Sequence, residues 1–577
     1  MWNMEIYANA RIYAMARESF GGLPESLKGR GTDAISAVTK EALVVDGARI
    51  AFVGSLSEAR DFAETGTKEI DCGGGVLLPG LVDSHIHALA TAASRFEVDL
   101  RSTRSLAEAV HRIAEHARYL PDGQWVTGGR WDANTWTDVH EPNRQLLDEL
   151  VPERPVAVWS IDFHTLWLNG AALASIGIDD DTPDPRGGRI VRDGNGAATG
   201  VLKEDAATLA ERQFPVAELE VRVEQLRQAQ QAWLAEGITG VHDFDGGAAR
   251  QAWRGLNKAG DLRLKVVKYL RLDEWDDPAV NDWRTGTREG TRFLQGGLKL
   301  FSDGALGSHT CHMTHPFPQV GSDGQPNYGL PIASEDVLAE QILGAYDRGI
   351  GVAIHAIGDK ANRTVLRAFE RTAQQRQHAI GVSGHPLRPR LEHAQFVQAC
   401  DVSRMAQLGA IASMQPRHCI SDIPLLPQVE GHPGLLAYPW GELASAGVAL
   451  AFGSDAPVEP TNPFVGVYAA MTRATIDGDA STSFQPERRI SAYDAIRAHT
   501  SGAAYAAGLE EETGQLAPGM DADFIVVDSD PLVPKLGGGS GVTGSYESED
   551  ALFQHACAVR DTAVQMTVAG GKEVHTI

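Results

Sequence analysis

The stretch GGGVLLPGLVDSHIHA (73–88) decides the fold, because it joins an apolar strand to two closely spaced histidines. Near-continuous apolar runs of this length are typical of strands buried on both faces of a parallel sheet. Seven similar runs follow, separated by helical stretches, at 238–244, 265–272, 297–304, 351–359, 390–396, 411–416 and 449–457. Eight such strands alternating with helices predict an α/β protein built on a (β/α)8 TIM barrel.

The helical stretches between these strands carry apolar residues at three- and four-residue spacing. They include residues 216–237, 334–349 and 359–376, and a further helix is expected at 490–508 after the last strand. We assign residues 77–509 to the barrel as a whole.

Two further parts are expected, because 577 residues exceed one ordinary core. Short strands and turns dominate both chain ends, so residues 1–76 and 510–577 are predicted to form a composite, β-sandwich-like domain. The hairpin at 41–54 is expected to share one sheet with strands from the C-terminal end. Residues 95–215 interrupt the barrel after its first strand, which predicts an inserted subdomain covering the active-site face.

Composition narrows the class of function. The formal net charge of -25 disfavours nucleic acid and anionic membranes as partners. Five cysteines without a CxxC pair argue against a disulfide framework or a cysteine-based zinc site. Neither a secretory signal nor an apolar run long enough for a membrane span is evident, so a cytoplasmic location is expected. General oligomer statistics make a homodimer plausible.

Ionisable residues gather at the ends of the predicted barrel strands. His85 and His87 end the first strand and, at positions i and i+2, face one side. The others are Lys299 in the fourth strand, His355 in the fifth, His393 in the sixth and Asp455 at the end of the eighth. Imidazole and carboxylate are ligands for zinc and similar divalent ions. Each residue alone is a weak signal, but their joint placement favours a metal site.

The chain resembles the amidohydrolase superfamily and, within it, the YtcJ-like branch, the amidohydrolase-3 family that includes N-substituted formamide deformylases. The motifs that carry the resemblance are LLPGLVDSHIHA (77–88), GLKLFSDGALGS (297–308), AIHAIGDKA (353–361), RLEHAQ (390–395), SMQPRH (413–418), FGSDAPVEP (452–460) and GQLAPGMDADFIVVD (514–528). WDANTW (131–136) and IDFHTLWLN (161–169) resemble motifs of the branch's inserted segment.

The resemblance implies a centre of one or two divalent ions, with zinc the expected metal. His85, His87 and Asp455 would bind one ion, and His355 and His393 a second. Lys299 would bridge the two as an N6-carboxylated lysine, because a free ammonium has no lone pair. The alternative is an ordinary Lys299 ammonium beside a single ion.

Such a centre implies attack of metal-bound hydroxide on a carbonyl carbon. Asp455 would take the proton of the water and pass it to the leaving nitrogen, or else act as a ligand alone. His418 would stabilise the oxyanion or bind substrate, or else cap a loop. His242, in the second strand, is expected to be a structural histidine hydrogen-bonded inside the barrel.

Candidate substrate contacts lie in the Trp-rich insertion and next to the fourth strand. They are Trp131, Asp132, His164, Asn169 and Asp303. The alternative for most aromatic residues of the insertion is that they build its own core. Asp303, with Gly304, would otherwise hold the loop after Lys299.

The sequence therefore predicts a metal-dependent amidohydrolase that cleaves a carbon–nitrogen bond, other than a peptide bond, in a small molecule. One rival keeps the barrel and the metal but catalyses decarboxylation, isomerisation or ester hydrolysis. A second rival is a non-enzymatic regulator, which would be expected to lose ligands, yet all six positions are present.

Overall fold

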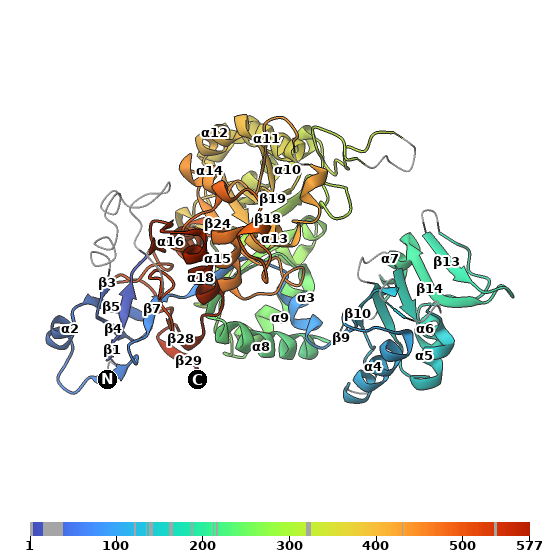
Figure 1. The fold of residues 1–577 in the computed structure, drawn as a ribbon, viewed down its shortest axis with the longest axis horizontal. Helices are drawn as coiled ribbons and strands as arrows, with labels where there is room; N and C mark the ends of the chain where they lie inside the picture. Colours follow the sequence, from blue (N-terminus) through green and yellow to red (C-terminus); the bar gives the residue numbers. More distant parts are fainter. Residues whose placement is uncertain are drawn as a thin grey trace. The chain divides into compact units, whose positions relative to one another are not determined.

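The computed structural model describes residues 4–15, 39–120, 123–133, 136–137, 142–160, 165–185, 188–211, 213–214, 217–318, 325–429, 431–535 and 539–577. The chain divides into two compact units (Figure 1). The first joins residues 1–91 with 222–577, and the second comprises residues 92–221.

The first unit contains the predicted barrel of eight parallel strands. Their spatial order follows their order in the chain. The strands are β8 (Leu81–Ile86), β15 (Ile238–Asp243), β16 (Lys265–Arg271), β18 (Phe293–Phe301), β19 (Val352–Ala356), β20 (Arg390–His393), β22 (Ile411–Met414) and β24 (Leu450–Phe452). Most of their residues are buried, as near-continuous apolar runs require. The α/β barrel fold is thus confirmed.

The barrel is nearly closed at a seam between β24 and β8. No strand ladder joins these two strands in the described part of the chain, but the amide of Asp455 donates to the carbonyl of His85 at 2.6 Å. The buried Asp83 carboxylate also accepts the amide of Ser454 at 2.9 Å. A side chain at position 453 would put its Cβ 2.3 Å from the His85 nitrogen, so glycine is required there.

Helices cover the outside of the barrel. They include α8 (Leu219–Ala235), α9 (Gly247–Lys258), α10 (Glu335–Asp347), α11 (Asp359–His378), α12 (Ala399–Leu408), α14 (Trp440–Ser445) and α15 (Pro463–Thr472). The single helix expected at 490–508 is instead two, α16 (Ala492–Ala498) and α17 (Ser501–Ala506). The break falls at Thr500, whose φ of -127° and ψ of -95° are not helical.

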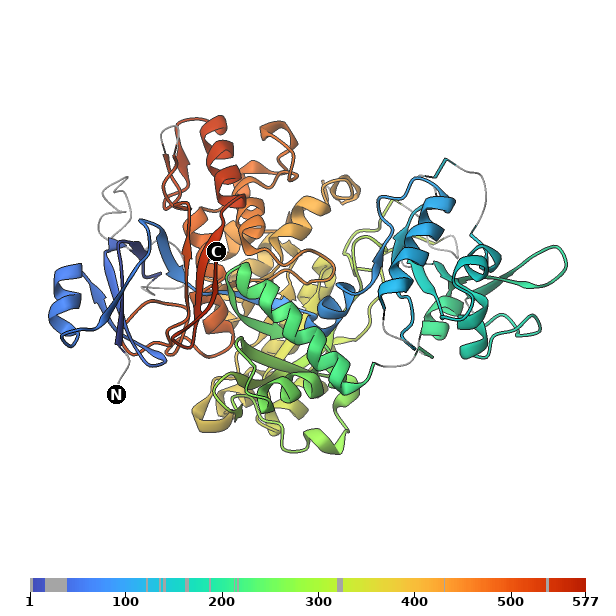
Figure 2. The same ribbon diagram turned by 90° about the horizontal axis from the view of Figure 1, so that it is seen from below.

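Strands from both chain ends meet beside the barrel in two sheets (Figure 2). One sheet has the order β5 (Arg49–Gly54), β4 (Ala42–Asp46), β1 (Met4–Ala8) and β6 (Lys68–Asp71). The other has the order β29 (Lys572–Thr576), β28 (Val564–Ala569), β25 (Phe524–Val527), β7 (Val76–Pro79), β2 (Arg11–Tyr13) and β3 (Thr39–Lys40).

The expectation that the hairpin at 41–54 shares a sheet with the C-terminal strands is wrong. The hairpin strands β4 and β5 pair with β1, whereas β25 pairs with β7. The two sheets instead share one hydrophobic core, to which Tyr7, Leu43, Leu77 and Phe524 contribute. Burial of this common core therefore joins the hairpin to the C-terminal strands. An isolated antiparallel bridge between Arg49 and Asp521 adds a backbone link, with the amide of Ile50 donating to the carbonyl of Met520 at 2.8 Å.

The second unit has a sheet of its own. Its strand order is β13 (Gly188–Arg192), β14 (Ala198–Glu204), β12 (Thr165–Leu168), β11 (Ala157–Ser160), β10 (Gly128–Trp131) and β9 (Val98–Asp99). The accompanying helices are α4 (Leu106–Tyr119), α5 (Arg144–Leu150), α6 (Gly170–Ser175) and α7 (Asp205–Glu211). Its place over the active-site face stays a prediction. In the described residues of the whole chain, none of the helices has the length and apolar character of a membrane span.

Candidate metal centre

The six residues predicted as metal ligands come from the C-terminal ends of barrel strands in the first unit. His85 is the penultimate residue of β8 and His87 lies just beyond its end. Lys299 lies in β18, His355 in β19, His393 in β20, and Asp455 follows β24. In a parallel barrel these ends form one rim, which is where active sites of such barrels are built.

Asp455 is the centre of a first group of ligand atoms. Its Oδ1 lies 3.6 Å from His85 Nε2 and 3.4 Å from His87 Nε2. His85 Nδ1 donates to Glu392 at 2.7 Å, and His87 Nδ1 donates to Asp245 at 3.1 Å. With each Nδ1 bound to a carboxylate, each Nε2 directs a lone pair at the site, which is the arrangement of metal-ligating histidines. The residues present therefore fit a divalent ion.

The electrostatics of this group also suit a cation. Burial lowers the pKa of His87, but the carboxylates of Asp245 and Asp455 outweigh burial and raise that pKa to about 9. Burial raises the pKa of Asp455, yet its histidine neighbours, led by His85, hold that pKa well below its ordinary value. Negative charge at the site thus attracts a proton or a metal ion strongly.

A second group of ligand atoms lies on the other side of the same carboxylate. His393, His418 and Asp455 each offer a ligand atom, all within 4.8 Å of one another. His393 Nδ1 donates to Gln415 at 2.8 Å, which again frees Nε2. His418 Nε2 lies 3.8 Å from Asp455 Oδ2, and this buried nitrogen has no hydrogen-bond partner among the described residues. A buried polar atom without a partner calls for a ligand, a water or an ion.

His418 is held in place by the short helix α13 (Pro416–Ser421). Arg417 Nε donates to one oxygen of Glu459 at 3.0 Å, and Ser421 Oγ donates to the other at 2.5 Å. Glu459 lies in the loop that follows Asp455. These bonds tie the helix to that loop, so His418 faces the Asp455 carboxylate.

His355 belongs to neither group in the described structure. Its Nε2 donates to the carbonyl of Gly304 at 3.1 Å, so only its Nδ1 lone pair is available to a metal. Burial, with Lys299 nearby, lowers the pKa of His355 to about 3. Its ring centre is 4.5 Å from that of His393. The predicted role of His355 as a ligand of a second ion stays a prediction.

Lys299 is buried at the centre of the barrel rim. Its Nζ lies 3.4 Å from His85 Nε2 and 4.7 Å from the ring centre of Phe244. Within the described residues, no carboxylate forms an ion pair with this ammonium. Burial lowers the pKa of Lys299 to about 8. A buried lysine without a carboxylate partner has an amine that can react or bind a ligand.

The backbone is strained at two of these residues. Asp455 has φ of 59° and His393 has φ of 72°, a left-handed conformation that side chains other than glycine rarely adopt. Such outliers cost about 1–3 kcal/mol and persist where function requires them. Glu392 and His393 are neighbours in β20, and both lie at the site.

Sequence analysis missed the buried network beneath the metal centre. Arg390 Nε donates to Glu392 at 2.9 Å, and Glu392 in turn accepts from His85. Arg390 also donates to His242 at 3.0 Å and to the Tyr269 hydroxyl at 2.8 Å. The structural role predicted for His242 is thereby confirmed. The motif RLEHAQ carries the signal, because it places an arginine and a glutamate in a buried strand next to a ligand histidine.

Two of the proposed substrate contacts are core residues of the second unit. Trp131 is buried in a hydrophobic cluster, and its Nε1 donates to the carbonyl of Val158 at 3.0 Å. Asn169 is fully buried, caps α6 by accepting from Ala172, and donates to the carbonyl of Val151. This packing corresponds to the alternative in which the insertion builds its own core.

The remaining proposed substrate contacts are Asp303, Asp132 and His164. Asp303 is buried, and its oxygens accept the amides of Ile357 at 3.0 Å, Gly358 at 2.8 Å and His312 at 2.8 Å. This geometry fits the loop-holding role better than a substrate contact. Asp132 is partly exposed, so its role stays a prediction, and His164 lies outside the described residues.

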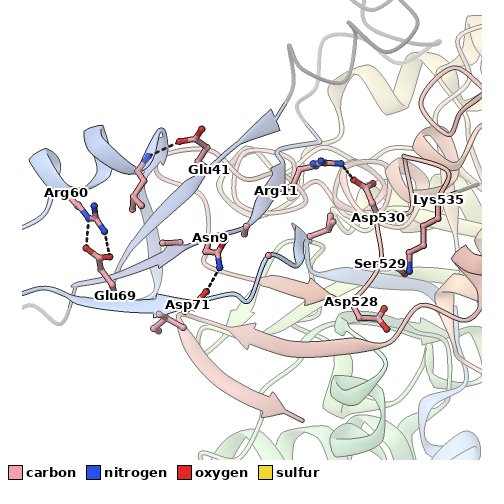
Figure 3. A pocket seen from close by; sticks show the side chains of 16 residues that line it. Asn9, Arg11, Glu41, Arg60, Glu69, Asp71, Asp528, Ser529, Asp530 and Lys535 are labelled. Atoms are coloured by element: carbon pink, nitrogen blue, oxygen red, sulfur yellow. Dashed lines mark hydrogen bonds and ion pairs between the residues drawn. The ribbon is translucent and has the colours of Figure 1, made fainter.

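A cavity of about 750 Å³ lies away from the metal centre, against the sheets at the chain ends (Figure 3). Its charged lining is largely paired internally. Arg11 bonds Asp530 at 2.6 Å, and Arg60 bonds Glu69 at 2.7 Å. Because these groups satisfy one another, the chemistry is assigned to the barrel rim and not to this cavity.

Sequence comparisons agree with the geometry. The model of the amidohydrolase family matches residues 68–575. The putative amidohydrolase YtcJ of Bacillus subtilis is 30% identical over 506 residues, covering 85% of this chain and 91% of its own. The N-substituted formamide deformylase of Arthrobacter pascens is 30% identical over 513 residues, covering 85% of this chain and 90% of its own.

A solved structure has the same fold. An uncharacterised metal-dependent hydrolase from Pyrococcus horikoshii is 26% identical with a TM-score of 0.74, covering 92% of this chain and 98% of its own. The family match, the relatives and the His/Asp cluster together support a hydrolytic, metal-dependent enzyme. The chain belongs to the amidohydrolase family.

Proposed function

We propose that this enzyme hydrolyses a carbon–nitrogen bond of the amide type, other than a peptide bond, in a small molecule. One observation carries the proposal: the Nε2 atoms of His85 and His87 converge on Asp455 Oδ1, while both Nδ1 atoms are bound to carboxylates. The formamide deformylase among the relatives supports the choice of bond.

His85, His87 and Asp455 would hold one divalent ion, with zinc the first choice for such ligands. His393 would hold a second ion together with His355 or His418. When bound, a divalent ion lowers the pKa of water toward neutrality and polarises a carbonyl group.

The residues of the chain supply the proton transfers and the positioning. Asp455 accepts the proton of the attacking water at a carboxylate oxygen and delivers it to the leaving nitrogen, so that an amine departs. His418 Nε2, which has no partner among the described residues, faces the same carboxylate and is placed to donate to the developing oxyanion. Glu392 and Asp245 keep the metal-binding histidines in orientation.

The first experiment counts metal per chain by plasma mass spectrometry and screens small amides for amine release. A metal content of about one or two ions per chain, together with amine release, supports the proposal. A chelator should abolish the release. Release of an alcohol from esters without any amine release would favour the rival reaction on the same barrel. Protein that holds no metal, even after reconstitution, would overturn the proposal.

The variant His418→Ala separates the two roles open to this residue. If His418 donates to the oxyanion, kcat should fall about a hundredfold while the metal count stays unchanged. If His418 is a ligand of the second ion, the metal count itself should fall. The matched control is His499→Asn, a buried histidine whose Nδ1 bonds the carbonyl of Val82 at the start of β8, which should keep the metal count.

Lys299 is proposed to carry an N6-carboxylate. Its neutral amine would attack CO2 to form the carbamate and release one proton, which supplies the lone pairs a bridging ligand needs. When the holoenzyme is equilibrated with ¹³C-bicarbonate, its ¹³C NMR spectrum should show a carbamate signal. The variant Lys299→Ala should lose this signal. Lys268→Ala is the matched control, because Lys268 is equally buried but donates to backbone carbonyls. A signal unchanged in Lys299→Ala would contradict the assignment.

A further inference from the structure

Arg271 is the inward-facing residue that ends barrel strand β16. In the parallel ladder it pairs with Lys299, and residues paired in this way point to the same face. Tyr269, two residues earlier, points into the barrel, where its ring stacks on Phe244 at 4.4 Å. The alternation of side chains therefore places Arg271 inside the barrel mouth, one layer above Tyr269.

The stem of Arg271 also lies beside the loop that orients His87. A Cβ added at Gly246 would sit 3.5 Å from Arg271 Cδ, and Gly246 directly follows Asp245. Asp245 is the carboxylate that accepts from His87 Nδ1. Two neighbouring elements thus place Arg271 next to the metal centre.

The guanidinium of Arg271 is only weakly paired. Its one ion pair in the described part of the chain is from Nε to Asp273 at 3.5 Å, and the side chains are 43% and 67% exposed. Exposed pairs of this kind contribute little. By contrast, Arg254 holds Glu289 with two bonds of 2.8 and 2.6 Å.

We propose that Arg271 binds an anionic group of the substrate, so that the enzyme takes amides carrying a carboxylate near the scissile bond. A guanidinium fork matches the two oxygens of a carboxylate, and the barrel mouth offers no competing tight partner among the described residues. Phe301, 37% exposed and 5.4 Å from the ring centre of His355, provides an apolar contact for the remainder. The inference rests on the proposed function of the same site.

The test compares two probes by calorimetry on the metal-loaded enzyme. N-acetylphenylalanine carries the carboxylate, and N-acetylphenylalaninamide is its neutral match. The wild type should bind the carboxylate at least about tenfold more tightly, Arg271→Met should lose this preference, and Arg271→Lys should keep part of it. The control Arg60→Met alters an exposed arginine in the N-terminal sheet region and should leave both affinities unchanged.

Equal affinities in the wild type would overturn the inference. So would a preference that persists in Arg271→Met, because the carboxylate would then be bound by the metal rather than by the guanidinium. The metal content of each variant is counted in parallel. A loss of preference at unchanged metal content supports the role of Arg271, whereas absence of metal from the wild type is a failure of the proposed function instead.

Discussion

At the two ends of the barrel, buried charged side chains meet their partners in opposite ways. At the N-terminal end, Arg292 donates to both oxygens of Asp523 at 2.8 and 2.7 Å. At the C-terminal end, His418 Nε2 has no partner in the described structure, and Lys299 has no carboxylate ion pair there. The satisfied end stabilises the fold, whereas the unsatisfied end is prepared for a ligand.

The largest effect should come from Asp455→Asn, which replaces the carboxylate of the unsatisfied end by an amide of equal size. The amide cannot accept a proton, so kcat should fall at least about a thousandfold. Turnover and thermal unfolding are both measured. Asp523→Asn is the matched buried control and should keep turnover. Near-normal turnover of Asp455→Asn would remove the proton-transfer role, and retained function in cells would revive the non-enzymatic alternative.

The next effect concerns the support of a ligand. Burial raises the pKa of Glu392, but Arg390 and His85 together outweigh burial and hold that pKa well below its ordinary value. In Glu392→Gln, the new amide group must face one of two donors, Arg390 or His85. Zinc affinity, measured by competition with a chelator, should fall by up to about a hundredfold.

Glu289→Gln provides the control for that loss. Glu289 also binds an arginine with two bonds, but it lies by the N-terminal end of the barrel, so zinc affinity should not change. If both variants lose zinc to the same extent, a general loosening of the barrel would explain the effect, and the positioning role of Glu392 would be rejected.

The same contrast shows what could be predicted from sequence. The barrel and the strand-end ligands were predictable, because apolar runs and their ends are local features. The residues that hydrogen-bond to the ligands were not predictable. Glu392 serves His85, which is 307 positions away. Strict alternation along β20 would also put Glu392 and His393 on opposite faces, yet both lie at the site, and His393 has a left-handed backbone with φ of 72°.

Arg271 and the N-terminal hairpin illustrate the same limit. The inward direction of Arg271 is inferred from its pairing with Lys299, and this strand register cannot be predicted from the sequence. The residue pattern of the hairpin at 41–54 is compatible with either sheet. The pattern does not show which strand pairs with the hairpin, and the structure shows that this strand is β1. Local structure could be predicted from the sequence, whereas the pairing of distant strands could be seen only in the folded structure.

The smallest effect on turnover is expected at the satisfied end, where Asp523→Asn should change stability alone. Burial raises the pKa of Asp523, but Arg292 together with Lys265 outweighs burial and lowers that pKa to about 2. Because the folded-state pKa lies below the unfolded value of about 4, the ion pair stabilises the fold by about 2 kcal/mol at neutral pH. This contribution is fully present above pH ~4 and is lost as the pH falls toward ~2. Urea unfolding of wild type and variant should therefore differ at pH 7 and converge in acid. A difference that stays constant with pH would show that packing, and not charge, is what Asp523 contributes to the satisfied end.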